Sequence, residues 1–186
     1  MKPIGILMRE HRIIERMLTV LERERAMMKN TGRFNMDVLT EGVEFFRMYG
    51  DKIHHGKEED ILFREMDAKP LSIEHRRIMS QLIDEHTQIR MIIRTMDTAR
   101  EHYNRNNHEQ LLEIETIYES LQSMYAKHVE LEEKHFFYPA MEYFSDDEQQ
   151  DMIAQFYDYD SKTMKEKYEA MVKHFENEKP VLIKDV

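Results

Sequence analysis

The chain has 186 residues, with 37 acidic and 27 basic side chains, no cysteine, five glycines and four prolines. This length fits one domain, and the scarcity of glycine and proline argues against a fold of many short strands. The lack of cysteine excludes disulfides, thiolate metal sites and thiol nucleophiles, and the formal charge of −10 argues against binding to nucleic acid or anionic membranes.

The first part of the chain predicts two long helices. The first runs from Pro3 to about Lys29, with apolar residues spaced three and four positions apart, and ends at the turn over residues 30–32. The second runs from about Asn35 to just before Pro70, because the residue preceding a proline disfavours helical backbone angles.

The remainder predicts three further helices, over residues 72–103, 107–137 and 145–178. Ser72 is a favourable N-cap for the first of them. Capping-box patterns begin the other two, and Pro139 marks the expected end of the helix that starts at 107. Each expected helix is therefore bounded by local stop signals.

Short loops between long helices place consecutive helices antiparallel. The expected fold is all-α: an up-down-up-down four-helix bundle over residues 1–144, an additional C-terminal helix over 145–178 packed on the same domain, and a tail at 179–186. No stretch approaches the roughly 18 apolar residues of a membrane span, and the apolar start is too short for a secretion signal. We therefore expect a soluble, cytoplasmic protein that binds neither membrane nor nucleic acid.

One histidine occupies the inward stripe of each of the first four helices: His11, His54, His86 and His128. In an antiparallel hairpin, residues at equal height lie symmetrically about the loop, because every residue rises by about 1.5 Å. The midpoints of the three consecutive pairs fall at residues 32–33, 70 and 107, all in predicted turns. We therefore expect the four imidazoles to lie in one layer of the bundle core.

Two of these histidines are followed by the same pattern of carboxylates. Glu58 lies four residues after His54, and Glu132 lies four residues after His128, so each glutamate shares a helix face with its histidine. Four histidines and two glutamates suit two iron ions bridged by the carboxylates, with manganese as the alternative metal.

The second helix offers a competing frame. His55 with Glu59 also has the i, i+4 spacing, and the loop symmetry does not separate neighbouring residues. The continuous apolar stripe and the repeat around His128 favour His54 with Glu58. A helical scaffold without metal is the other alternative, but four buried histidines in one layer would then be costly to desolvate.

These segments resemble the hemerythrin-like family, also called the HHE cation-binding domain. The resemblance spans roughly residues 5–144 and rests on GluHis at 10–11, HisHisGlyLysGluGluAspIleLeuPhe at 54–63, AspGluHis at 84–86 and the segment from 128 to 144. It implies a four-helix bundle with a non-heme di-iron site. The ligands that it implies, position by position, are His11, His54, Glu58, His86, His128 and Glu132.

The chain departs from the respiratory hemerythrins in its third helix. Those proteins have two histidines four residues apart there, whereas Leu82 and Arg90 flank His86 at that spacing here. His135, two turns after His128, is the candidate for a fifth imidazole, with a role beside the site as its alternative. An iron with an open position shifts the expectation from simple oxygen carriage towards sensing or redox chemistry.

The resulting hypothesis is a di-iron protein that binds O2 or a related diatomic such as NO for sensing, storage or a redox response. One alternative is oxidase or peroxidase chemistry at the same site. Another is a ferritin-like iron oxidase or storage protein, to which the Glu-x-x-His spacing of Glu132 and His135 points. No motif in the sequence identifies a protein partner.

Overall fold

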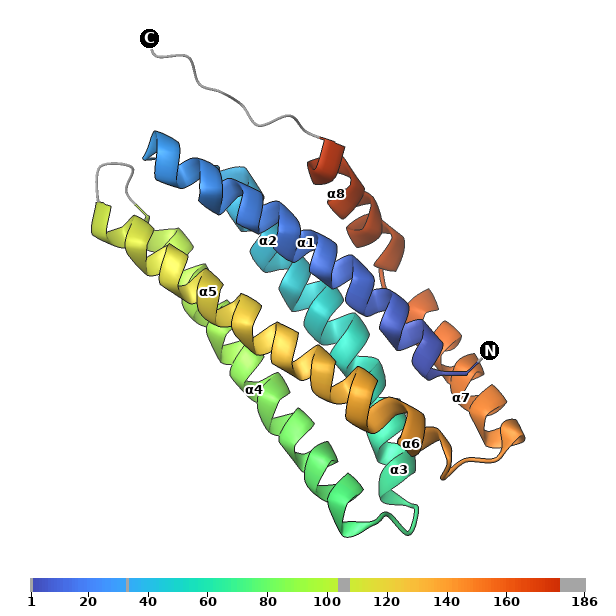
Figure 1. The fold of residues 1–186 in the computed structure, drawn as a ribbon. Coiled ribbons are helices and arrows are strands. Elements are labelled where there is room, and N and C mark those ends of the chain that lie inside the picture. Colours follow the sequence, from blue (N-terminus) through green and yellow to red (C-terminus); the bar gives the residue numbers. More distant parts are fainter. Residues whose placement is uncertain (1, 33, 104–107, 178–186) are drawn as a thin grey trace.

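The computed structural model of the chain is a bundle of long helical rods (Figure 1). It describes residues 2–32, 34–103 and 108–177, and all regular structure within them is helical. The predicted tail at 179–186 lies outside these residues. The four rods of the bundle are α1 (Ile4–Thr31); α2 (Met36–Phe45), η1 (Phe46–His55), η2 (Glu58–Phe63) and α3 (Arg64–Asp67); α4 (Ile73–His102); and α5 (His108–Leu131), η3 (Glu132–Phe136) and α6 (Phe137–Met141).

Consecutive rods run antiparallel, as Figure 1 shows. Helix ends follow the predicted signals closely: Gly32 adopts a left-handed backbone (φ 65°) at the end of α1, and the Ser72 side chain caps the start of α4. The predicted all-α bundle is confirmed.

Two apolar clusters fill the bundle on either side of a polar layer. One includes Ile14, Phe46 and Leu121 near the α1–α2 turn, and the other includes Leu82 and Phe136 near the opposite end. All five side chains are essentially inaccessible to solvent. The polar layer is therefore enclosed by apolar packing from above and below.

Three segments, η1, η2 and η3, are π-helical and lie at the level of the polar layer. A π-helix bonds i to i+5 and so shifts the face on which later residues lie. This shift was not foreseen, because the predicted faces assumed regular α-helices. The fourth rod also passes its expected end, since Pro139 lies in the first turn of α6, where backbone N–H groups need no helical partner.

The C-terminal region forms two helices where one was expected. They are α7 (Asp146–Ser161), which begins at the predicted capping box, and α8 (Lys165–Asn177). Between them, the hydroxyls of Ser161 and Thr163 donate hydrogen bonds to backbone carbonyls three residues earlier. Such side-chain bonds compete with the continuing helix, which accounts for the break.

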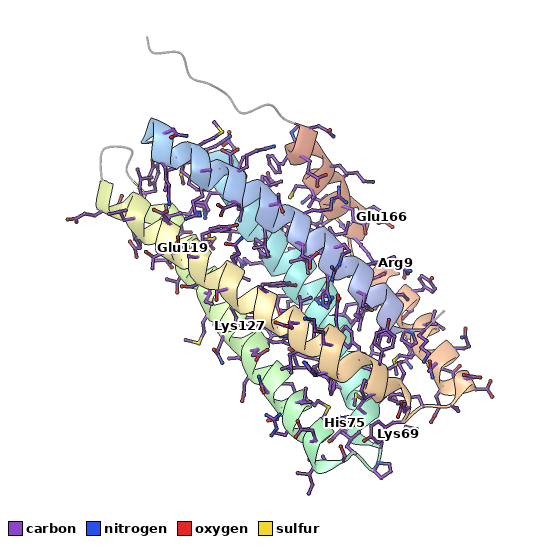
Figure 2. All side chains as sticks on the ribbon, viewed as in Figure 1. Arg9, Lys69, His75, Glu119, Lys127 and Glu166 are labelled. Carbon is purple, nitrogen blue, oxygen red and sulfur yellow. The ribbon has the colours of Figure 1, made fainter. Side chains whose placement is uncertain are left out.

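Charged side chains cover the outer faces of the rods, as Glu119, Lys127 and Glu166 illustrate (Figure 2). The high charge content of the sequence is thus placed mostly in solvent. None of the described helices combines the length and the apolar character that crossing a membrane requires.

Candidate metal centre

Two adjacent groups of buried ligand-type side chains occupy the polar layer. Members of each group offer nitrogen or oxygen atoms that lie within 4.8 Å of one another. Glu58 belongs to both groups, so its carboxylate is positioned to bridge two ions. The first group contains His55, Glu58, His86 and His128, and the second contains His11, His54, Glu58 and Glu132.

Both glutamates face the two groups at once. The Oε1 atom of Glu58 lies 3.6 Å from Nε2 of His54, and its Oε2 atom lies 3.3 Å from Nε2 of His86. Glu132 spans the groups in the same way, with its oxygens 3.0 and 3.3 Å from the Nε2 atoms of His11 and His128. Each carboxylate therefore presents one oxygen to each group.

The inward-facing polar atoms of the site have no hydrogen-bond partner among the described residues. They are both carboxylate oxygens of Glu58 and Glu132 and the Nε2 atoms of His11, His54, His55, His86 and His128. Burying so many polar atoms without partners is costly unless a bound group satisfies them. Two metal ions fit this requirement, and imidazole and carboxylate donors suit iron or manganese better than a soft metal.

Carboxylates outside the two groups hold the outward nitrogen of four imidazoles. A histidine that donates its outward N–H in this way keeps its inward nitrogen free as a metal ligand. His55 has a looser partner in Asp51, at 3.7 Å. The four pairs are His11 with Glu133 (2.8 Å), His54 with Glu10 (3.2 Å), His86 with Glu59 (2.6 Å) and His128 with Glu85 (2.9 Å).

Burial favours the neutral form of three of these imidazoles. It lowers the pKa of His54 and His86 well below the usual value, and lowers the pKa of His55 to about 4. His11 differs from these three. Burial lowers its pKa too, but the close carboxylates of Glu132 and Glu133 outweigh that effect and raise the pKa to about 9.

The pKa values of Glu58 and Glu132 are shifted in opposite directions when no metal is bound. Burial, together with the neighbouring Glu132, raises the pKa of Glu58 well above its usual value. Burial acts the same way on Glu132, but contacts with His128 and His11 prevail and lower its pKa to about 2. Without metal, Glu58 therefore takes up a proton more readily than Glu132 does.

The structure brings six of the predicted site residues into the two groups and leaves one out. His135 is exposed and belongs to neither group. Its expected position, two α-turns after His128, is changed because the π-helical η3 intervenes. The expectation that His135 lies at the site is therefore corrected on structural grounds.

His55 lies in the site, although the sequence favoured His54 with Glu58 over His55 with Glu59. The two competing frames assumed that only one of His54 and His55 faces the core, but both are buried at the end of the π-helical η1, one in each group. Glu59 lies at the edge, bonded to His86. The available signals were the histidine doublet and the i, i+4 spacing of Asp51 with His55.

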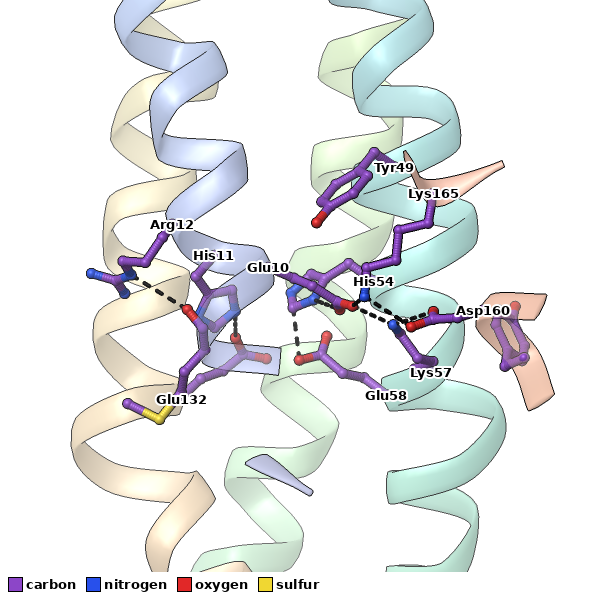
Figure 3. A network of polar contacts seen from close by, with 12 residues as sticks. Glu10, His11, Arg12, Tyr49, His54, Lys57, Glu58, Glu132, Asp160 and Lys165 are labelled. Carbon is purple, nitrogen blue, oxygen red and sulfur yellow. Dashed lines mark hydrogen bonds and ion pairs between the residues drawn. The ribbon is translucent and has the colours of Figure 1, made fainter. Parts of the chain in front are cut away.

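A network of charges lies beside His54, at the junction of α7 and α8 (Figure 3). Glu10 accepts a hydrogen bond from His54 and also pairs with Lys57 and Lys165. Asp160 bonds the same two lysines, at 2.6 and 2.8 Å. Lys57 is completely buried. Because Asp160 and Lys165 belong to the C-terminal region, this interior ion network joins the C-terminal helices to the candidate metal centre.

Comparison with known proteins points to one family. The model of the hemerythrin HHE cation-binding domain matches residues 2–122, a span that includes His11, His54, His55, Glu58 and His86. His128 and Glu132 follow the matched span, and the fold brings them to the same site. No curated protein and no solved structure gives a significant match. Since the match covers more than half of the chain, the chain belongs to the hemerythrin HHE cation-binding domain family.

Proposed function

We propose that this chain holds two iron ions and uses them to bind O2 or NO for sensing, storage or a redox response. The observation that carries the proposal is the set of inward-facing, unpartnered nitrogens and carboxylate oxygens in two groups that share Glu58. Iron, when bound there, supplies the electrons and the coordination position that a diatomic ligand requires.

The two groups are unequal in protein donors. His55, His86 and His128 would offer three imidazoles to one ion, whereas His11 and His54 would offer two to the other, and Glu58 is common to both groups. An ion beside His11 and His54 would therefore have more room for an external ligand. This asymmetry supports ligand binding over a closed structural metal site.

The neighbouring residues keep water away from the site. Leu7 and Leu82 lie one turn from His11 and His86, Phe136 lies one turn after Glu132, and all three are fully buried. A dry, apolar surrounding strengthens electrostatic interactions within the site and limits side reactions with solvent. These residues favour binding of a small neutral molecule that does not need hydration.

A ferritin-like role is less well supported. Its Glu-x-x-His motif needs His135 beside Glu132, but the His135 side chain is exposed. Oxidase or peroxidase chemistry would use the same donors as diatomic binding. Product analysis after exposure of the reduced protein to O2 separates them, since turnover gives repeated O2 consumption and simple binding does not.

The test begins with metal analysis of the purified protein and absorption spectra before and after reduction and re-exposure to air. We expect two irons per chain, and manganese in their place would redirect the proposal. Glu58→Ala combined with Glu132→Ala should lower the stoichiometry. Glu130→Ala, an exposed glutamate on the same rod that pairs with Lys134, is the matched control and should retain full loading.

A titration of the oxidised protein with azide then tests the exchangeable position. A spectral change that saturates with azide supports the proposal. If the iron-loaded protein shows no change with azide, and reduced protein shows none with O2 or NO, the centre is closed and the diatomic-binding function is wrong.

A further inference from the structure

Tyr125 lies one turn before His128 on α5 and directs its side chain into the bundle beside the metal centre. Its ring stacks on that of His55, with centroids 6.5 Å apart, and its centroid lies 6.1 Å from that of His128. Only 1% of the residue is exposed. Tyr125 is therefore in direct contact with two of the imidazoles that form the first group.

The hydroxyl of Tyr125 is buried and has no hydrogen-bond partner among the described residues. Other buried tyrosines in the same cluster are satisfied. Tyr118 donates to the carbonyl of Leu18 at 2.7 Å, and Tyr168 donates to Glu44 at 3.0 Å. Tyr103, at the end of α4, also has an unpartnered hydroxyl. A buried hydroxyl without a partner is unfavourable, and the position of Tyr125 beside the metal centre points to a ligand of that centre as its partner.

The surroundings keep this hydroxyl available as a donor. Burial and the nearby carboxylates Glu58 and Glu132 raise the pKa of Tyr125 well above its usual value, so the phenol keeps its proton. Of these carboxylates, Glu58 belongs to both groups and Glu132 to the second.

Tyr125 lines a groove of about 350 Å³ between α1 and α5, together with Leu18 and Val129. Tyr125 thus lies between this surface groove and the metal centre.

We propose, resting on the function proposed above, that the Tyr125 hydroxyl donates a hydrogen bond to a small ligand bound at the metal centre. The ligand class is a diatomic molecule or short anion that presents an acceptor atom to this hydroxyl. Tyr125 is then a ligand-binding residue that sets affinity, and it is not required for holding the metal.

The experiment compares Tyr125→Phe with wild type in the full-length, iron-loaded protein, with azide as the probe. Phenylalanine keeps the ring on His55 and removes only the hydroxyl. A single lost hydrogen bond should weaken azide binding about 2- to 12-fold. Tyr118→Phe, seven residues earlier on the same helix, is the matched control and should leave azide affinity unchanged.

Two further readouts separate ligand binding from a structural role. Iron stoichiometry should be the same in Tyr125→Phe and wild type. In the metal-free protein, Tyr118→Phe should lower the melting temperature by about 2–4 °C because it loses a made hydrogen bond, whereas Tyr125→Phe should not lower it.

Three results would overturn the role of Tyr125 alone, and they are distinguishable from failure of the proposed function. Equal azide affinities of wild type and Tyr125→Phe, or loss of iron from Tyr125→Phe, would overturn the role of Tyr125 alone. So would a lower melting temperature of metal-free Tyr125→Phe that matches that of Tyr118→Phe. Absence of azide binding to iron-loaded wild type would also overturn this inference, and the proposed function with it if the reduced protein shows no change with O2 or NO.

Discussion

Lys57→Met should destabilise the metal-free protein through the charge that it leaves behind. Lys57 is fully buried and pairs with Glu10 and Asp160, and Lys165 pairs with the same two carboxylates. Two cations and two anions therefore balance in the interior. Methionine matches lysine in length, so the substitution removes one cation without opening a cavity and leaves the network with a net negative charge.

The expected cost is about 3 kcal/mol. Removing one partner of a buried ion pair costs about 3–5 kcal/mol, because the remaining charge is left uncompensated. The lower end applies because Lys165 still contacts Glu10 and Asp160, and about a sixth of its side chain reaches solvent. For a chain of this length the cost corresponds to a fall in melting temperature of about 6–12 °C.

Urea unfolding of the chelator-treated protein, followed by circular dichroism, measures the effect at a constant m-value. Lys69→Met is the control, because Lys69 pairs with the half-exposed Glu148 at the surface and its loss should cost no more than about 1 kcal/mol. Adding Glu10→Gln to Lys57→Met should cost less than the sum of the two single changes. If Lys57→Met costs no more than Lys69→Met, the balance of buried charges is not a source of stability.

Three other predictions follow from the site and its supports. His55→Ala should lower the iron content measured by metal analysis, whereas His135→Ala should keep it, and the reverse order would exclude His55 as a ligand. His11, with a pKa of about 9, carries a proton at pH 7 that the metal must displace, so metal binding should release protons and should weaken as the pH falls below 9. Calorimetry in buffers of different ionisation enthalpy would detect the proton release, and its absence would contradict this charge state of His11. Gly56→Ala should not stabilise the wild-type protein, because the added Cβ would lie 2.2 Å from the Tyr159 hydroxyl, but should raise the free energy of unfolding of a Tyr159→Ala variant by about 1 kcal/mol. Urea unfolding measures both effects, and equal effects in the two backgrounds would show that the contact is unimportant.

The bundle itself was predictable from local signals. Apolar spacing identified the long helices, and residues such as Gly32, Ser72 and Ser145 marked their ends, since capping and left-handed turns depend on single side chains. The symmetry of His11, His54 and their counterparts about the loops was also enough to predict a common layer. These features depend on residue spacing and on single capping side chains, both of which are visible in one sequence.

The details of the site were not predictable in the same way. Whether His54, His55 or both face inward depends on the π-helical η1, and a π-turn has no reliable signature in residue spacing. The same limit misplaced His135 after η3. The unpartnered hydroxyl of Tyr125 depends on packing between distant helices and is visible only in three dimensions.

The α7–α8 junction gives the C-terminal helices a part in the interior of the bundle. Asp160 and Lys165 lie on either side of the break, and through Glu10 they reach the imidazole of His54. A straight helix in place of the break would move these two charges apart. Shortening the chain after the fourth rod would therefore leave Lys57 without one of its two counter-ions. The C-terminal helices are thus an integral part of the domain and cannot be removed without disturbing its interior.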